Sequence, residues 1–424
     1  MFWIKGGFQR VLMQKANFQT NPVAEAPRLD ELSRQVYGVL GIPIDAMGLS
    51  LSLKILEASV ESREPFWLST PNVNFLVTSQ VEEQFRESLL LSDLCLVDGM
   101  PIVWVARLLG VPIEHRVTGA DLFDALKFAD RFDRRFGVFL LGGASEVAVR
   151  VGNLLNAQSR GLKCVGTLNP GFGTVDEMSS GKIIDAINAS GADILAVFFS
   201  AKKAQAWLLK NYDRLRIPVR AQFGATINFE AGTIKRAPHF LRNAGLEWLW
   251  RIKEEPYLWR RYWTDGKSLL HLFLTGALPL IVDSLWTRAR SARTGEGLRI
   301  ELRENDRSVV VHLSGRAIAV HIQEAIKVFR EALSKEKAID VDVSSTSRFD
   351  PRFFGLLLMV RKQLRRRGQS LRFIKVPPAI NRAFRWNRFE FLLSSEIGGM
   401  EEPAARRSVL GSNRLRSPSI IERD

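Results

Sequence analysis

The sequence has few of the residues that form disulfides or hold metal ions. Its 424 residues include two cysteines, Cys95 and Cys164, and five histidines. Each cysteine lies in an apolar run typical of a strand, so we expect two reduced, packed thiols and no disulfide framework. No histidine falls at ligand spacing with a second histidine or a cysteine. The sequence therefore predicts neither a metal site nor a bound cofactor.

Several phosphate-binding and nucleophile motifs are also missing. The chain has no Walker A loop, no Gly-x-Ser-x-Gly elbow and no Gly-x-Gly-x-x-Gly fingerprint. Its one Asp-x-Asp triplet, a pair that holds a divalent cation in many sugar-nucleotide enzymes, is formed by Asp340 and Asp342. This triplet lies inside an alternating strand where both acids are expected to face solvent, so we discount it as a metal site.

The N-terminal residues lack the charged segment and apolar core of a secretory signal, so the expected location is the cytoplasm. The formal net charge of +15 predicts an anionic partner: a nucleic acid, lipid headgroups or a diphosphate substrate. Arginine gathers in two stretches, at 235–261 and 361–367, which suggests two separate surfaces. Nucleic acid binding would rest on charge alone and is not predicted.

Between residues 36 and 225, short apolar runs alternate with longer segments of helical period, the pattern of repeated βα units. The predicted strands are 66–68, 94–97, 138–141, 164–166, 194–198 and 219–223. The segments between them have one apolar face each for the sheet. The prediction is a Rossmann-like α/β domain at 36–245, with a mostly parallel sheet and helices on both faces, preceded by an N-terminal extension at 1–35.

Beyond residue 245 the sequence becomes helical, with tryptophans and arginines interleaved. Residues 269–286 are apolar, but the interior Pro279 and Asp283 weaken a membrane-spanning prediction. We expect 246–287 to form a basic, aromatic helical appendage that associates with the membrane surface. Residues 288–297 are small and polar and predict a linker.

Residues 298–396 predict a second, smaller α/β domain. Its expected strands are 308–313, 338–343 and 370–376, and its expected helices are 322–333 and 354–367. The polar, arginine-rich segment 397–424 predicts a disordered tail.

Polar residues and glycines follow the predicted strands of the first domain, where an open parallel sheet binds its ligands. The side chains of Thr70 and Asn72 could bind a sugar or uracil, or could cap the next helix. Asp98 could take a proton from an attacking hydroxyl or could cap a helix in the same way. Gly142 and Gly143 fit a phosphate-binding turn, although a bare glycine pair is more often a tight βα turn.

Several ordered motifs run along the first domain. The longest are Ala-Gly-Thr-Ile-Lys-Arg-Ala-Pro at 231–238 and Gly-Leu-Glu-Trp-Leu-Trp-Arg at 245–251, and shorter ones lie at 41–45, 69–72, 93–99, 106–110, 116–122 and 139–143. Together, residues 36–263 resemble the WecG/TagA/CpsF glycosyltransferase family. The resemblance implies transfer of an N-acetylmannosamine-type sugar from a UDP donor to a polyprenyl-diphosphate-linked sugar without a bound metal, in surface polysaccharide synthesis at the inner face of the cell membrane.

Carried over by position, the resemblance makes Asp98 the candidate general base and makes Thr70 and Asn72 substrate contacts beside it. It also implies a basic appendage that reaches the membrane and closes over the diphosphate by charge-assisted hydrogen bonds, here through Arg251, Arg260 and Arg261. These arginines could instead line a solvated helix face. The interleaved tryptophans favour a membrane interface.

One position departs from the family pattern. Where the family usually has a glutamine, an ungapped alignment places Ala204, with Gln205 one residue later. A helical step turns a side chain by about 100°, so Gln205 is a candidate substrate contact that leaves the donor open. The departure also motivates an alternative function, a non-catalytic regulator or scaffold that uses a degenerate transferase domain and the second domain for interactions.

The second domain carries Val-His-Leu-Ser-Gly-Arg at 311–316 and Leu-Leu-Leu-Met-Val-Arg-Lys at 356–362. These runs resemble a STAS (anti-sigma-factor antagonist) domain. Regulatory members have a phosphorylatable serine after the aspartate that precedes the second helix, whereas here Pro351 follows Asp350. We therefore expect no phosphorylation switch at this place and interpret the domain as a docking module for a protein partner.

Overall fold

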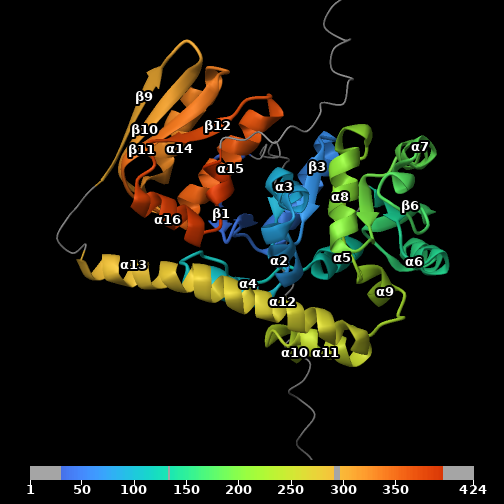
Figure 1. Ribbon diagram of the computed structural model, residues 1–424. Coiled ribbons are helices and arrows are strands. Elements are labelled where there is room, and N and C mark those ends of the chain that lie inside the picture. The colour runs from blue at the N-terminus through green and yellow to red at the C-terminus, as the bar shows by residue number, and fades with distance from the viewer. Residues whose placement is uncertain (1–29, 132–133, 291–296, 395–424) are drawn as a thin grey trace, which may run out of the picture.

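A computed structural model of the chain describes residues 30–131, 134–290 and 297–394 (Figure 1). The predicted tail at 397–424, most of the N-terminal extension and the greater part of the predicted linker lie outside these ranges. The described residues form a large α/β unit, a small α/β unit and a long helix that runs beneath both.

The large unit is built on a six-stranded sheet in the order β4-β3-β8-β7-β5-β6. All neighbouring strands run parallel. The strands are β3 (Phe66–Ser69), β4 (Leu94–Cys95), β5 (Phe136–Leu141), β6 (Leu162–Leu168), β7 (Ile194–Val197) and β8 (Val219–Gln222). Each overlaps a strand expected from the sequence, so the Rossmann-like prediction is confirmed.

Helices cover both faces of this sheet because the inner strands carry apolar side chains in both directions. One face packs against α1 (Leu49–Ser62), α5 (Gly119–Phe128) and α6 (Ser145–Gln158). The other packs against α7 (Gly181–Ala189) and α8 (Ala201–Asn211), with Trp207 fully buried. The region beyond the carboxyl ends of the strands, where an open parallel sheet binds its ligands, is called the crevice below.

A hairpin that the sequence reading did not predict precedes the sheet. It pairs β1 (Val36–Val39) with β2 (Ile42–Asp45) through a turn in which Leu40 and Gly41 both have positive φ. Its apolar residues share a core with α2 (Val73–Val81), α3 (Glu83–Leu91) and α4 (Met100–Leu108). Proline and the short strand lengths of the hairpin hide the alternating pattern that would have predicted it.

The appendage begins after α9 (Thr226–Glu230) and includes α10 (His239–Asn243), α11 (Glu247–Glu254) and the short turn η3 (Pro256–Leu258). It continues as one long helix: α12 (Trp259–Leu272), a π-helical turn η4 (Phe273–Ala277) and α13 (Leu278–Arg290). The long helix therefore ends inside the stretch expected to be a linker. Its part Pro256–Leu285 is long and apolar enough to cross a membrane by length and composition alone.

The small unit has a four-stranded sheet in the order β12-β11-β10-β9. Its elements in chain order are β9 (Leu298–Glu304), β10 (Ser308–Ala317), α14 (Ile322–Ser334), β11 (Ala338–Phe349), α15 (Pro351–Arg366), β12 (Leu371–Ile374) and α16 (Pro378–Trp386). The strands and helices expected from the sequence are present, and β9 and α16 are additional.

The expectation that Asp340 and Asp342 face solvent is wrong. Only 8% of Asp340 and 4% of Asp342 is exposed, because cationic side chains from the β12 side cover both carboxylates. Asp340 forms an ion pair with Arg372 at 2.7 Å, and Asp342 forms one with Lys375 at 2.7 Å. Both acids thus neutralise cations from the β12 side of the sheet.

The two units meet at a seam where α15 packs on β1. A Cβ atom added to Gly355 of α15 would lie 1.9 Å from the carbonyl oxygen of Val36, so the backbones are in direct contact. Residues Leu32, Val36 and Leu90 belong to the same apolar core as the small unit. The last residues of the expected N-terminal extension are therefore part of this packed seam.

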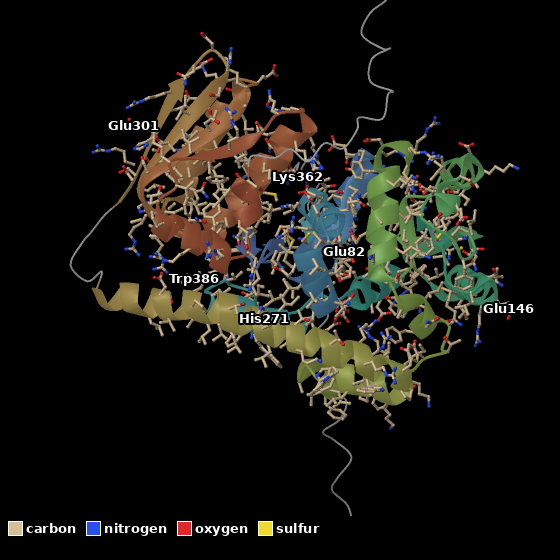
Figure 2. The ribbon with its side chains drawn as sticks, in the orientation of Figure 1. Glu82, Glu146, His271, Glu301, Lys362 and Trp386 are labelled. Carbon is tan, nitrogen blue, oxygen red and sulfur yellow. The ribbon has the colours of Figure 1, made fainter. Side chains whose placement is uncertain are left out.

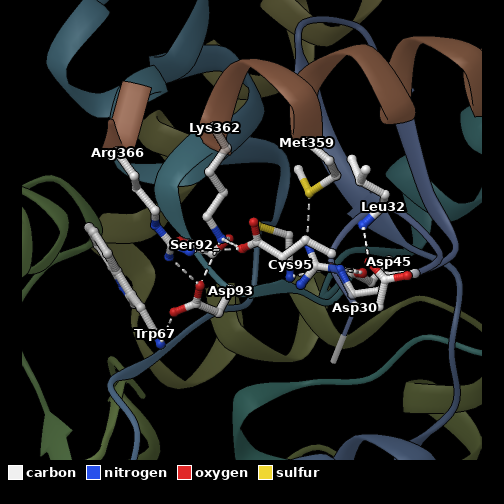
Figure 3. A network of polar contacts seen from close by, with 12 residues as sticks. Asp30, Leu32, Asp45, Trp67, Ser92, Asp93, Cys95, Met359, Lys362 and Arg366 are labelled. Carbon is white, nitrogen blue, oxygen red and sulfur yellow. Dashed lines mark hydrogen bonds and ion pairs between the residues drawn. The ribbon is translucent and has the colours of Figure 1, made fainter. Parts of the chain in front are cut away.

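Buried charges cross the seam above this apolar contact (Figure 3). The amine of Lys362, with a side chain that is 0% exposed, lies 2.7 Å from Asp93 and 2.7 Å from Glu31. Arg366 adds a second contact to Asp93 at 2.8 Å, and Arg34 pairs with Asp45 at 3.0 Å. Figure 2 shows Lys362 between the two units.

Candidate active site

The loops after β3 and β4 meet at the open end of the sheet. The backbone N–H of Asp98 donates to the carbonyl oxygen of Pro71 at 3.0 Å, because β3 and β4 are neighbours and end together. Gly99 and Asn72 are also close, since a Cβ on Gly99 would lie 3.5 Å from the Cα of Asn72. The structure thus brings Asp98 and the 70–72 loop into one place.

Asp98 does not cap the helix that follows it in the chain. Helix α4 begins at Met100 and its N-cap position is Gly99, which makes no side-chain capping bond. The carboxylate of Asp98 instead accepts from the backbone N–H of Gly119, at the start of α5. The expectation that Asp98 caps the helix near Pro101 is therefore wrong, and its carboxylate instead meets an N–H group in the first turn of α5.

The charges around Asp98 favour its protonated form. Burial raises its pKa well above the usual range of an aspartate, and the carboxylates of Glu247 and Asp121 raise it further. Arg116 and the N–H of Gly119 oppose this rise. A raised pKa makes the ionised carboxylate a stronger base, which suits a group that must accept a proton from a substrate hydroxyl.

Thr70 and Asn72 border this carboxylate in different ways. Thr70 is 4% exposed, and its hydroxyl lies 3.5 Å from the position of a Cβ on Gly119, the residue that binds Asp98. Asn72 is the N-cap of α2, where its Oδ1 accepts from the N–H of Phe75 at 3.3 Å. The cap accounts for the oxygen of Asn72 and leaves its amide N–H groups for a ligand.

Residues 236–255 of the appendage, called the roof below, contact α5 and the residues that precede it. Arg116, which precedes α5, pairs with Glu247 at the first position of α11 at 2.9 Å. Arg236 bridges Asp121 and Asp124 of α5, with its bond to Asp124 at 2.6 Å. Four carboxylates and several guanidinium groups therefore surround the end of β4.

Arg251 belongs to this roof. It pairs with Glu255 one turn later, and its guanidinium lies 5.4 Å from the ring centre of Phe229 in α9, beyond the end of β8. Its side chain is 18% exposed, so it faces inward from α11.

Comparison with known proteins gives this geometry a context. Residues 37–280 match the glycosyl transferase WecG/TagA/CpsF family, and residues 300–393 match the family described as Mlab, STAS domain. The chain belongs to the WecG/TagA/CpsF family. One relative is an N-acetylglucosaminyldiphosphoundecaprenol N-acetyl-beta-D-mannosaminyltransferase of Bacillus spizizenii (strain ATCC 23059 / NRRL B-14472 / W23), 29% identical over 215 residues, which are 49% of this chain and 81% of the relative.

The protein is therefore a glycosyltransferase whose transferase domain carries a C-terminal STAS domain. Several residues around Asp98 had no role in the sequence reading although they lie in motifs that carried the resemblance: Arg116, Asp121, Arg236 and Glu247. Their signal was their presence in three of the runs that carried the resemblance, at 116–122, 231–238 and 245–251. The sequence alone does not show that Arg116 pairs with Glu247 and Arg236 with Asp121, because these pairs depend on how the appendage packs against α5.

Gly142 and Gly143 lie at the end of β5, which two other strands separate from β3. Their φ angles are +95° and +75°, and a Cβ on Gly142 would lie 2.5 Å from the ring of Phe199. Tight packing within the chain thus explains glycine at the first position without a ligand. A phosphate contact through these backbone N–H groups stays a prediction.

Gln205 is 0% exposed and lies behind the crevice. Its Nε2 donates to the hydroxyl of Ser69 at 3.1 Å, one residue before Thr70. Ala204 is also fully buried, in the core between α8 and the sheet. The amide of Gln205 therefore supports the end of β3 from inside and does not line the crevice surface.

Arg260 and Arg261 are exposed on α12. Each lies over a neighbouring aromatic ring, Trp259 for Arg260 and Tyr262 for Arg261. The structure therefore places both on the long helix, and Arg261 stays close enough to Arg251 that both act on the phenol of Tyr257.

A metal centre would need clustered ligands. Across residues 30–131, 134–290 and 297–394, no group of three or more histidine, cysteine, aspartate or glutamate side chains is placed to hold a metal ion. The two cysteines are free thiols, and burial raises the pKa of Cys95 to about 12.

Proposed function

We propose that this glycosyltransferase moves an N-acetylmannosamine-type sugar from a UDP donor to a polyprenyl-diphosphate-linked sugar, with Asp98 as the general base. The observation that carries the proposal is the position of Asp98: a carboxylate of raised pKa just beyond the carboxyl end of a parallel strand, not used as the cap of the helix that follows. The printed name of the Bacillus spizizenii relative supplies the sugar and the kind of acceptor.

In the proposed reaction the acceptor hydroxyl attacks the anomeric carbon of the donor. The new bond joins the acceptor oxygen to that carbon, and the bond from the carbon to the UDP oxygen breaks, with the electron pair leaving on UDP. The hydroxyl proton passes to Asp98. One base suffices for this single displacement, and a positioned general base contributes about 10²–10⁴-fold to the rate.

Other residues would bind the substrates. Thr70 and the amide N–H groups of Asn72 lie beside Asp98 and are proposed sugar contacts. Arg251 in the roof is a proposed diphosphate contact, because a guanidinium offers paired donors to phosphate oxygens. Gly142 and Gly143 precede α6, whose N-terminal N–H groups face the crevice end of β5. Catalysis through these groups would require no metal.

The long helix is the proposed membrane-binding surface. Its exposed apolar residues recur at helical spacing on one side: Trp259, Trp263, Leu270, Leu274, Leu278, Val282 and Leu285, of which Trp263 is 64% exposed. The opposite side, with Leu258, Leu272 and Ala277, is buried against the protein. A helix that is apolar on a second, uncovered side and flanked by cations suits the interface of an anionic bilayer. The enzyme would then meet its lipid-linked acceptor at the cytoplasmic face.

The STAS domain is proposed to act as a docking module. The side of α15 that carries Lys362 already contacts the transferase domain, so a separate protein partner would use another face of the domain. The exposed loop with Val320, 83% exposed, is on such a face.

The test is an assay with UDP-N-acetylmannosamine and a short-chain lipid-diphosphate N-acetylglucosamine acceptor, read by mass spectrometry, with and without a chelator. Asp98→Asn is expected to lower kcat about 10²–10⁴-fold. The matched control is Asp185→Asn, an exposed acid of α7. Full activity of Asp98→Asn would refute the base assignment, and no product from any UDP-sugar would refute the donor class.

A further inference from the structure

A second pocket lies at the seam, away from the crevice. It has a volume of about 300 Å³ and is lined by residues of three parts of the chain. Gln80 and Arg86 come from α2 and α3, His271 from α12, and Arg388 and Phe391 from the STAS domain after α16. Figure 2 labels His271 on the long helix, at the edge of this region.

Two guanidinium groups of this pocket have no acidic partner. Within the described ranges, neither Arg86 nor Arg388 has a carboxylate oxygen within 4.0 Å, and the Nε atom of each is buried without a hydrogen-bond acceptor. Arg86 lies 4.4 Å from the ring centre of Phe391 and donates to the carbonyl oxygen of Ser79 at 3.4 Å. Arg388 donates to the hydroxyl of Thr275.

The surroundings add positive charge. Arg361 and Arg365 of α15 both pair with Glu87, the residue that follows Arg86, and Arg361 also lies 5.9 Å from the ring centre of Phe391 in the pocket lining. The one acid of the pocket lining, Glu390, is exposed at its edge. Cations on low-dielectric walls raise the local concentration of anions.

We propose that this seam pocket binds a phosphate group between Arg86 and Arg388. A buried Nε–H group without an acceptor is costly, each of these half-buried arginines has one, and a phosphate offers several acceptor oxygens in the geometry that guanidinium groups match. The volume is at the small end of ligand sites, enough for a phosphate-bearing headgroup or small phosphate ester.

Binding would connect the two domains. Arg86 belongs to the transferase domain and Arg388 to the STAS domain, so one phosphate would link them across the seam. The phosphate could be a free ester or the headgroup of an anionic lipid, because His271 is exposed next to Leu270 and Leu274 of the long helix. The site itself does not depend on the proposed sugar chemistry.

The experiment uses the full chain and two sources of phosphate at constant ionic strength. Glycerol 3-phosphate is titrated by calorimetry with chloride as the reference anion, and vesicles of phosphatidylglycerol are compared with vesicles of phosphatidylcholine. Arg86→Gln and Arg388→Gln are each expected to weaken binding at least tenfold, a loss that matches about 1.4 kcal/mol. The matched control is Arg385→Gln, an exposed arginine of α16 outside the pocket.

The outcomes separate the sources. Arginine-dependent binding of glycerol 3-phosphate supports a free phosphate ester, and arginine-dependent binding of anionic vesicles alone supports a lipid headgroup. Hydrogen exchange of the unmodified protein should show slower exchange in α3 and at 388–391 when phosphate is bound, which keeps the test valid if a variant misfolds. Absence of binding from both sources, or an equal loss in Arg385→Gln, would overturn the proposal.

Discussion

Lys362 of the STAS domain lies 2.7 Å from Asp93 at the start of β4, and its side chain is 0% exposed. Asp93 also accepts from the backbone N–H of Trp67 in β3 at 2.9 Å. The STAS domain therefore contacts the amino end of β4 directly and contacts β3 through Asp93. Thr70 and Asp98 follow the carboxyl ends of the same two strands. The C-terminal domain thus packs against the two strands on which the candidate site is built.

We expect Lys362→Met to destabilise the protein by about 3 kcal/mol, because it leaves Asp93 and Glu31 without their shared buried cation. Arg366 still contacts Asp93, which keeps the loss at the lower end for a broken buried pair. Urea denaturation measures this change in the free energy of unfolding. Lys335→Met, which removes an exposed ion pair with Glu304, is the matched control and should change stability by no more than about 1 kcal/mol.

This contribution should depend on pH with a definite sign. Burial raises the pKa of Asp93, but the charges of Lys362 and Arg366 outweigh it and the pKa is lowered overall. A lowered pKa stabilises the fold above the pKa of the unfolded chain, about 3.9, and the effect is lost as the pH falls through the folded value. The difference between wild type and Lys362→Met should thus be full at pH 7 and shrink below about pH 4. A constant difference across that range would contradict the ion pair as its source.

The pH profile of transfer should respond to two charged groups near Asp98, one in the roof and one before α5. The base must be ionised, so kcat/KM falls on the acid side as the pH drops through the pKa of Asp98. Glu247→Gln removes a negative charge and should move this acid limb to lower pH, whereas Arg116→Gln removes a positive charge and should move it to higher pH. Shifts in the same direction would argue against Asp98 as the titrating base.

Asp98→Asn should not cost stability at neutral pH. Its pKa is raised in the folded state, so the ionised carboxylate penalises folding above the pKa of the unfolded chain. Removal of that charge should raise Tm at pH 8 and leave it nearly unchanged at pH 3. A residue that lowers the stability of the folded protein is typical of a functional site. A lower Tm at pH 8 would indicate a structural role instead.

The proposed membrane-binding side of the long helix can be tested by placing negative charges on it. Leu270→Glu and Leu278→Glu place a carboxylate on the side proposed to face lipid, where 57% of Leu270 is exposed and little packing is lost. We expect each to reduce sedimentation with anionic vesicles at least tenfold and to leave activity on a short-chain soluble acceptor unchanged. Val320→Glu in the STAS domain is the matched control. Equal vesicle binding by all three variants would exclude this surface.

The sheet could be predicted from the sequence because its strands are short, continuous apolar runs that differ clearly from the helices between them. The β1–β2 hairpin could not, since Pro43 and the positive φ of Leu40 interrupt its pattern. The Asp340 and Asp342 pair shows a similar limit. Alternation correctly placed both on one side of β11, but only the neighbouring strand reveals the cations that cover them.

Part of the candidate site could also be predicted from the order of the strands. Thr70, Asn72 and Asp98 follow adjacent strands, so strand-end logic brings them together. Arg116 and Glu247 are 131 positions apart and meet only because the turn before α11 packs on α4. The covered side of α15 was equally hidden, because its lysine and arginines resemble a solvated helix face until Glu87 and Asp93 are placed opposite them.

Ala204 stands where the family usually has a glutamine. Ala204 is 0% exposed in the core with Trp207 and Leu208, so Ala204→Gln adds volume and a polar amide to a filled site. We expect a loss of about 1–3 kcal/mol and no gain in affinity for UDP-sugars. Ala206→Gln, half-buried on the same helix, is the control and should be milder. Tighter donor binding by Ala204→Gln without loss of stability would show that the family glutamine can act here. The neighbouring Gln205, already bonded to Ser69, would then be a support for β3 only.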